Sequence, residues 1–189
     1  MRCLVLDCGP SPDGNTATAA GIVAEVLRGE GCDTALFRVH DLRLTPCSSC
    51  RVCERAGACP IEDDMRLLNP HVESDDLIMV AAPVFFYHLP GYAKIVVDRC
   101  QPFWARTRLL GRPPARSKRL QSVLIGGSRG ERLFDGIRLT LRYWADAINA
   151  VTDESADLLL RGVDAPGDVR AYDDHVRAFA RACCGRSVT

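Results

Sequence analysis

The sequence predicts one α/β domain, built as a doubly wound, five-stranded parallel sheet with helices on both faces. Apolar runs of strand length alternate about five times with segments of helical periodicity. One of these runs, Leu77 to Ala82, is continuously apolar, which is typical of a strand covered on both faces of a parallel sheet. With 189 residues, the range 1–189 is expected to form a single unit.

Glycine and proline mark the ends of the expected elements. The strands are predicted at residues 2–8, 34–39, 77–82, 122–125 and 155–160, and the helices at 15–29, 63–68, 92–104, 131–149 and 168–182. Gly29 and Gly31 are expected to stop the first helix, and Asn69-Pro70 the second. The stretch 106–119, rich in Arg and Pro, is expected to be exposed.

The composition favours a cytoplasmic protein that binds neither nucleic acid nor a membrane. The 24 basic side chains balance the 24 acidic ones, and no apolar stretch resembles a signal peptide or a membrane span. In a reducing cytoplasm, ten cysteines point to metal or redox chemistry rather than to disulfides. The six dispersed cysteines are expected to be small buried hydrophobes: Cys3, Cys8, Cys32, Cys100, Cys183 and Cys184.

Three loops follow predicted strands and therefore meet at one edge of the sheet, where such folds bind ligands. Residues 9–17 bring small polar side chains and free N–H groups to a helix start, which suits a phosphate monoester or is simply a helix cap. Residues 83–91 place aromatic side chains beyond a buried strand, as a platform for a flat ring or as a lid or subunit contact. Residues 126–130 are rich in glycine, which has no side chain, so their backbone could come close to a ligand; alternatively they form an ordinary turn. Together the loops favour a flat phosphorylated cofactor.

A cysteine-rich loop at residues 46–60 is the most specific feature of the sequence. Cys47, Cys50, Cys53 and Cys59 have the spacing C-x2-C-x2-C-x5-C, and a proline follows. Four thiolates are the usual ligands of a [4Fe–4S] cluster, whereas four-cysteine zinc sites commonly use two separated C-x2-C pairs. The cluster is the favoured prediction. Two alternatives stay open, a zinc ion and a metal-free loop in which Cys50 and Cys53 form a redox-active dithiol.

Three segments resemble the NADPH-dependent FMN reductase family, which has a flavodoxin-like fold. They are Gly14-Asn15-Thr16-Ala17, Ala82-Pro83-Val84-Phe85-Phe86 and Lys94-Ile95-Val96-Val97-Asp98-Arg99. The cysteine loop narrows the resemblance to the iron–sulfur flavoprotein branch. It implies that FMN contacts residues of the three loops, namely Ser11, Gly14, Asn15, Thr16, Ala17, Pro83, Val84, Phe85, Phe86, Gly126, Gly127 and Ser128.

Two positions depart from the family pattern. The phosphate loop lacks the usual arginine, with Asp13 next to Pro12, so weaker or differently anchored phosphate binding is expected. Phe85 stands where tyrosine is usual, so a phenol hydrogen bond is lost. His88 is the one histidine beside the flavin loop and a candidate proton donor, although a lone histidine is more often incidental.

The resemblance implies an FMN-dependent oxidoreductase in which the flavin carries the chemistry, and no catalytic side chain is assigned. Electrons are expected to pass between a donor, NAD(P)H or a reduced protein carrier, and an acceptor by way of FMN and a [4Fe–4S] cluster. The alternatives are a cluster-free NAD(P)H-dependent FMN or quinone reductase and a non-enzymatic electron carrier. A homodimer or tetramer is also expected, because family members generally place flavin near a subunit interface.

Overall fold

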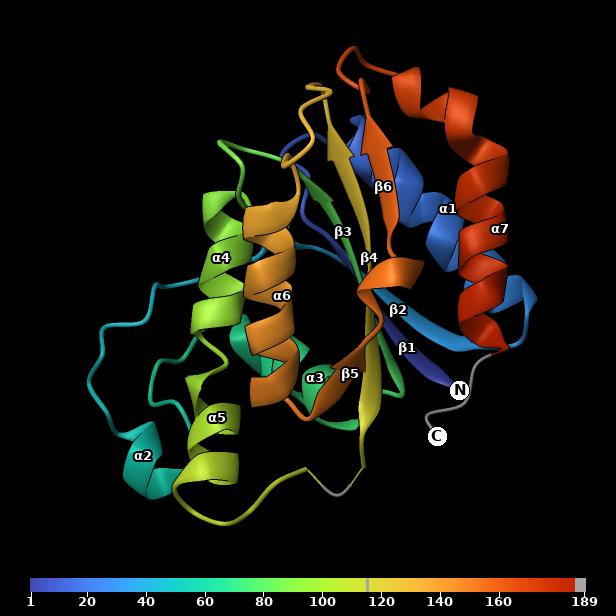
Figure 1. Cartoon of the computed structure of the whole chain (residues 1–189). Coiled ribbons are helices and arrows are strands. Elements are labelled where there is room, and N and C mark those ends of the chain that lie inside the picture. The colour runs from blue at the N-terminus through green and yellow to red at the C-terminus, as the bar shows by residue number, and fades with distance from the viewer. Residues whose placement is uncertain (115, 186–189) are drawn as a thin grey trace.

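The computed structural model describes residues 1–114 and 116–185, and it has the predicted flavodoxin-like architecture (Figure 1). The strands are β1 (Arg2–Asp7), β2 (Asp33–Arg38), β3 (Leu77–Pro83), β4 (Lys118–Gly126), β5 (Ala150–Thr152) and β6 (Leu158–Arg161). All pairings are parallel, in the order β2-β1-β3-β4-β5, and β6 also pairs with β4. The predicted doubly wound parallel sheet is confirmed.

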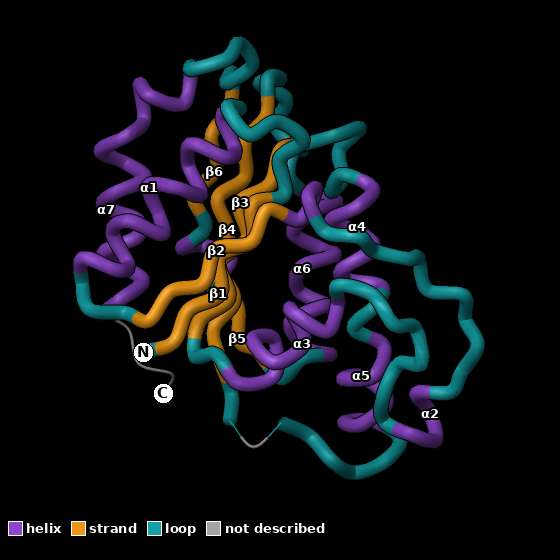
Figure 2. Tube along the Cα trace, turned by 180° about the vertical axis from the view of Figure 1, so that it is seen from behind, coloured by secondary structure: helices purple, strands orange, loops and turns teal. Residues whose placement is uncertain are grey.

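Helices cover both faces of the sheet and bury two separate apolar cores (Figures 1 and 2). On one face lie α1 (Asn15–Gly29) and α7 (Asp173–Cys184). On the other lie α3 (Met65–Ser74), α4 (Gly91–Asp98), α5 (Gln101–Arg108) and α6 (Asp135–Ala147), and the short α2 (Cys53–Ala56) packs outside α5. Short 3-10 turns occupy Val39–Asp41, Glu154–Ala156 and Asp168–Tyr172.

Two helix predictions were wrong, each at a proline. Helix α3 does not stop at Asn69-Pro70 but continues to Ser74, because Leu68 and Val72 bury the same face one turn apart. The helix predicted at 92–104 is instead two helices, α4 and α5, broken at Arg99 and Cys100. Pro102 lacks the N–H that would continue α4, so the backbone turns and a new helix begins there.

The stretch 106–119 is not uniformly exposed as predicted. Lys118 and Arg119 belong to β4 and are buried, at 1% and 9% exposure. The Lys118 ammonium donates to the carbonyl oxygens of Glu73 and Ile148, 3.0 and 3.2 Å away, so its polar end is satisfied at the bottom of the sheet. The long stem of the side chain makes this burial compatible with an apolar core.

The fifth strand position is split into two pieces, whereas a single strand was predicted at 155–160. β5 pairs with Lys118–Leu120 and β6 pairs with Val123–Gly126, and a 3-10 turn interrupts the edge between them. Because of this interruption, no carbonyl oxygen of the described strands β5 and β6 accepts the backbone N–H of Ser122. The carboxylate of Asp157 accepts that N–H at 2.8 Å instead.

Asp157 gives the fold a predicted pH dependence. Burial raises the pKa of Asp157 to about 6, although the hydrogen bonds from Ser122 and the charge of Arg138 oppose the shift. A raised carboxyl pKa contributes stability below the unfolded-state value near 4, and this contribution is lost as the pH rises through about 6. Asp157→Asn keeps an oxygen for Ser122 but cannot ionise.

We therefore expect the free energy of unfolding of the native protein to fall relative to that of Asp157→Asn by on the order of 1–2 kcal/mol between pH 4 and pH 7.5. Urea unfolding at a series of pH values measures the difference. Parallel stability curves for the two proteins would contradict this assignment.

Candidate FMN cavity and cysteine loop

One cavity of about 400 Å³ opens at the carboxyl ends of the central strands, and all three predicted loops line it. Nine of the twelve expected FMN-contacting residues are in its wall: Ser11, Gly14, Asn15, Thr16, Pro83, Val84, Phe85, Gly126 and Gly127. Parallel pairing explains the convergence, because β3 and β4 run in register from Leu77 with Arg119 to Pro83 with Ile125. Their loops consequently leave the sheet side by side.

The first loop ends at the start of α1, where backbone N–H groups are available. The N–H groups of Asn15, Thr16 and Ala17 begin the helix and have no acceptor one turn back, and within the described structure the cap residue Gly14 offers no side chain to them. An anion such as a phosphate monoester is favoured there by these donors and by the helix dipole.

A fourth loop, not predicted from the sequence, completes the cavity. Val163, Asp164 and Pro166 line it. The side chain of Asn15 holds this loop in place, since its amide nitrogen donates to Ala165 O (2.9 Å) and its oxygen accepts from Gly167 N (3.0 Å). Asn15 therefore holds the fourth loop with its side chain, and its backbone N–H is one of the donors available to an anion.

Gly127 lies directly against the side chain of Asp164 in this fourth loop. A Cβ atom at position 127 would lie only 2.6 Å from Oδ1 of Asp164. Any side chain would displace either the Asp164 carboxylate or the loop that carries it. The glycine thus lets the Asp164 side chain lie against the strand-to-helix loop at the wall of the cavity.

The other predicted FMN contacts lie outside the cavity wall. Phe85 to His88 form a tight hairpin turn in which Phe86 and Tyr87 adopt left-handed φ angles of 49° and 62°. Phe86 is fully exposed at its tip. The Ser128 hydroxyl accepts the N–H of Gly130 (3.1 Å), and Ala17 lies in the first turn of α1. Their predicted contacts with FMN remain predictions.

His88 is not among the described residues that line the cavity. Its Nδ1 accepts the backbone N–H of Leu89 at 3.0 Å, which leaves the proton on Nε2. Nε2 lies 3.1 Å from the hydroxyl of Thr140 on α6. Both ring nitrogens therefore have partners within the protein, which favours a structural role over the proposed proton donation.

The charge of the cavity is unusual for an anion site. Within the described part of the chain, Asp13 and Asp164 are the only ionisable side chains in its wall, and no lysine, arginine or histidine lines it. A phosphate group would consequently be held by backbone N–H groups and neutral polar side chains such as those of Ser11 and Thr16, with the exposed Asp13 carboxylate nearby.

The four cysteines of the loop 46–60 line a second cavity, of about 340 Å³, together with Arg99 and Pro102. Burial raises the pKa of Cys53, and the thiols of Cys47, Cys50 and Cys59 lie close enough to raise it further. Among the residues described, however, no three His, Cys, Asp or Glu side chains are gathered closely enough to hold a metal ion. The donor set therefore fits a four-thiolate group, but its members must draw together to bind one.

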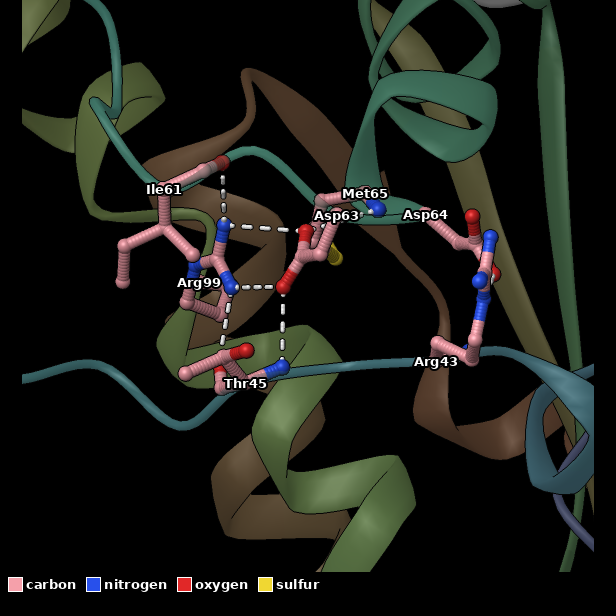
Figure 3. Close-up of polar contacts among 7 residues, drawn as sticks. All are labelled: Arg43, Thr45, Ile61, Asp63, Asp64, Met65 and Arg99. Carbon is pink, nitrogen blue, oxygen red and sulfur yellow. Dashed lines mark hydrogen bonds and ion pairs between the residues drawn. The ribbon is translucent and has the colours of Figure 1, made fainter.

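A buried ion pair fixes both ends of this loop (Figure 3). The guanidinium of Arg99, 1% exposed, pairs with the carboxylate of Asp63, 6% exposed. Arg99 also donates to Thr45 O at 2.6 Å, before the first cysteine, and to Ile61 O at 3.3 Å, after the last. Asp63 in turn accepts the N–H groups of Thr45 (2.8 Å) and Met65 (3.0 Å).

These hydrogen bonds decide the ionisation state of Asp63. Burial by itself raises the pKa of Asp63, but the donors from Arg99, Thr45 and Met65 outweigh it and bring the pKa below its usual value. The carboxylate is therefore charged at neutral pH. The pair was missed in the sequence, where Asp63 resembles an ordinary helix-capping residue and Arg99 is only part of the Lys94–Arg99 motif.

Between these fixed ends the loop backbone is strained. Ser49 and Arg51 both adopt left-handed φ angles, 56° and 59°, which cost roughly 1–2 kcal/mol each for residues other than glycine. Both lie between Cys47 and Cys53. Strained conformations of this kind gather at functional sites, because the surrounding structure must hold them.

The fold, with a cavity at the carboxyl ends of its central strands, is that of the flavodoxin-like class. The family model for NADPH-dependent FMN reductase matches residues 1–153. The chain therefore belongs to the NADPH-dependent FMN reductase family, as the sequence motifs predicted. The expected enzyme class, an FMN-dependent oxidoreductase, agrees with this family.

Relatives and solved structures agree with this assignment. The chain is 29% identical over 129 residues to an iron–sulfur flavoprotein of Methanocaldococcus jannaschii, covering 68% of this chain and 64% of that protein. It is 28% identical to an iron–sulfur flavoprotein of Methanosarcina thermophila, over 52% of each chain. The chain thus spans about half to two thirds of the length of these relatives.

Among solved structures, an NAD(P)H:quinone oxidoreductase of Methanothermobacter marburgensis superposes with a TM-score of 0.74 at 14% identity, covering 100% of this chain and 98% of that one. This likeness supports the fold. No helix in residues 1–114 and 116–185 is long and apolar enough to cross a membrane.

The charge of the FMN cavity leads to the first prediction for the site. Asp13→Asn removes a carboxylate from beside the phosphate position, so we expect FMN to bind about 2- to 10-fold more tightly at low ionic strength. Riboflavin, which lacks the phosphate, should bind with unchanged affinity. Flavin fluorescence titrations of the apoprotein measure both affinities.

Asp174→Asn, which removes an exposed carboxylate from the first turn of α7 outside the cavity, serves as the matched control and should leave both affinities unchanged. An equal gain for FMN and riboflavin in Asp13→Asn would show that Asp13 does not lie beside the phosphate.

The second prediction for the site concerns the loss of the buried guanidinium of Arg99. Arg99→Met leaves the Asp63 carboxylate buried without its partner, and we expect the free energy of unfolding to fall by about 3–5 kcal/mol. The backbone amides of residues 57–62 should also take up deuterium faster in the folded protein, because the loop end at Ile61 is released.

The matched control is Arg108→Met at the end of α5, which breaks a half-exposed pair with Asp146 and should cost about 1 kcal/mol or less. Urea unfolding and mass-spectrometric labelling rates provide the two readouts. Equal losses for Arg99→Met and Arg108→Met would contradict the role assigned to Arg99.

Proposed function

We propose that this protein transfers electrons between a donor, NAD(P)H or a reduced protein carrier, and an acceptor by way of FMN, with a [4Fe–4S] cluster at the cysteine loop. The observation that carries the proposal is the single cavity at the carboxyl edge of the sheet, lined by nine of the residues expected to contact FMN. Membership of the FMN reductase family supports the same cofactor.

The chain's own residues would bind and orient the flavin. The backbone N–H groups of Asn15, Thr16 and Ala17 would hold the phosphate, and Pro83, Val84 and Phe85 would border the ring. Bound FMN supplies the redox chemistry, since it exchanges one or two electrons. Asp13 and Asp164 are the only ionisable groups among the described lining residues, so protons needed at the flavin would come from solvent through the open cavity.

The cysteine loop would hold the cluster through Cys47, Cys50, Cys53 and Cys59. Three observations support this: the donor set, the common cavity, and the clamp by Arg99 and Asp63 at both ends of the loop. The matched relatives that are named iron–sulfur flavoproteins support it independently. A bound cluster would supply one-electron transfer.

A cluster-free NAD(P)H-dependent FMN or quinone reductase is the second candidate. It is favoured by the spread of the four thiols, since no three metal-binding side chains converge within the described residues. The similarity in fold to an NAD(P)H:quinone oxidoreductase is compatible with it. A carrier without substrate turnover is the third candidate.

We further propose a homodimer or tetramer. The exposed Phe86 and Tyr87 at the tip of the flavin-loop turn, at 103% and 54% exposure, are suited to a contact with a second copy of the chain.

Iron and sulfide content separates the candidates. Protein purified without oxygen and reconstituted with ferrous iron and sulfide is expected to contain about four irons and four sulfides per chain, with broad absorption near roughly 400 nm beside the flavin bands. Cys53→Ser should lose the iron and keep the flavin, because the two cavities have no lining residue in common among those described.

Flavin bands without iron after reconstitution would contradict the cluster and leave the cluster-free reductase. Rapid bleaching of the flavin by NADPH would then support that candidate. Reversible reduction without turnover of small substrates would support the carrier.

A further inference from the structure

A second group of thiols lies on the α1–α7 side of the sheet, away from the cysteine loop beside α5 (Figure 1). Cys32 follows α1 and Cys184 is the last residue of α7. Their sulfur atoms are 3.3 Å apart, although the residues are separated by 152 positions in the chain. Cys3, completely buried in β1, lies close enough to Cys32 for the two thiols to interact.

The turn that carries Cys32 has a fixed backbone. Gly31 adopts a left-handed φ of 81°, and the N–H of Cys32 donates to Leu27 O at 2.9 Å. The hydroxyl of Thr34 donates to Cys32 O at 3.1 Å. Cys32 itself is only 9% exposed, so its sulfur has little freedom to move away from the α7 side.

The end of α7 is held from two directions. Helix α7 shares a buried apolar core with α1, and on its surface Arg177 pairs with Glu25 of α1 at 3.1 Å. Arg119 of β4 donates to the carbonyl oxygen of Cys183, which anchors the last turn of α7 to the sheet. The neighbouring Cys184 is consequently presented to Cys32 by the packing of the whole helix.

We propose that Cys32 and Cys184 form a reversible disulfide that links the end of α7 to the turn after α1. A disulfide bond is about 2.0 Å long, so the sulfur atoms need to approach by little more than 1 Å. Both S–H bonds break and one S–S bond forms, with loss of two electrons and two protons. Hydrogen peroxide would take these up to give two waters, and a small-molecule disulfide would be reduced to two thiols.

The surroundings of the thiols make this a slow reaction. Burial, together with the neighbouring thiols, raises the pKa of Cys184 and that of Cys3 to about 12, so both are protonated at neutral pH. Because the thiolate is the reactive form, Cys184 is not suited to be the attacking thiol of a fast peroxide sensor.

The disulfide would tie together α1, whose first residues line the FMN cavity, and α7, which follows the fourth cavity loop. The fourth cavity loop, Val163 to Pro166, precedes α7, and Asn15 at the start of α1 holds that loop. α1 and α7 are thus joined through Asn15 at the cavity end, and the disulfide would join them at the other end. It would also close a loop of about 150 residues, which restricts the unfolded chain.

The test is disulfide mapping of the folded full chain after treatment with hydrogen peroxide or oxidised glutathione. Trypsin should release peptide 29–38 joined to peptide 182–186, and fragmentation should place the bond on Cys184. The oxidised protein should melt about 5 °C or more above the reduced one, and dithiothreitol should reverse this shift.

Cys32→Ser and Cys184→Ser should each lose the joined peptide and the shift in Tm. Cys3→Ala is the matched control from the same group of thiols and should keep both. A folded protein that yields no joined peptide with either oxidant overturns the proposal, as does a bond mapped to Cys3 or Cys183. None of these outcomes depends on flavin or metal binding.

Discussion

The register of β3 against β4 is the constraint on which the rest of the site depends. Seven residue pairs, from Leu77 with Arg119 to Pro83 with Ile125, align two strands that are buried almost throughout. A parallel register brings the carboxyl ends of both strands to the same edge. A slip of one residue would turn every side chain to the opposite face and separate the two loops that border the FMN cavity.

The Arg99–Asp63 pair has the corresponding role for the cysteine loop. A buried ion pair contributes little stability unless its remaining hydrogen-bonding groups are satisfied. Here the two Nη atoms of Arg99 and the carboxylate of Asp63 bind backbone on both sides of the four cysteines, so the interaction fixes the ends of a loop that contains only the short helix α2 among its described residues. Such an arrangement can hold strained residues such as Ser49 and Arg51 near a site where thiols must converge.

The sequence was sufficient for the fold and for most of the cavity, because both follow from short-range patterns. Apolar periodicity located the central strands, and the loops that follow them in a parallel sheet meet by topology. Long-range side-chain contacts could not be predicted in this way. The contact from Asn15 to the loop 165–169, the pairing of Arg99 with Asp63 and the approach of Cys32 to Cys184 all join residues far apart in the chain.

Local rules also failed where tertiary packing outweighed them. Proline predicted the end of α3, but burial of Leu68 and Val72 carries the helix past Pro70. The arginine-rich composition of residues 106–119 predicted that this stretch is exposed, but Lys118 is buried in β4, where carbonyl oxygens accept hydrogen bonds from its ammonium. In both cases the deciding partners lie in other elements of the fold.

The central claim is that this chain binds one FMN in the cavity between the four loops. A fluorescence titration of apoprotein with FMN, performed on the native chain and on Gly127→Leu, tests it most directly. The account predicts saturation at one FMN per native chain and much weaker binding in the variant, since Gly127 lines the cavity and a leucine there would occupy space that the flavin needs and displace the Asp164 side chain. Equal binding by both proteins in the folded state, or no saturable binding by the native chain, would contradict it.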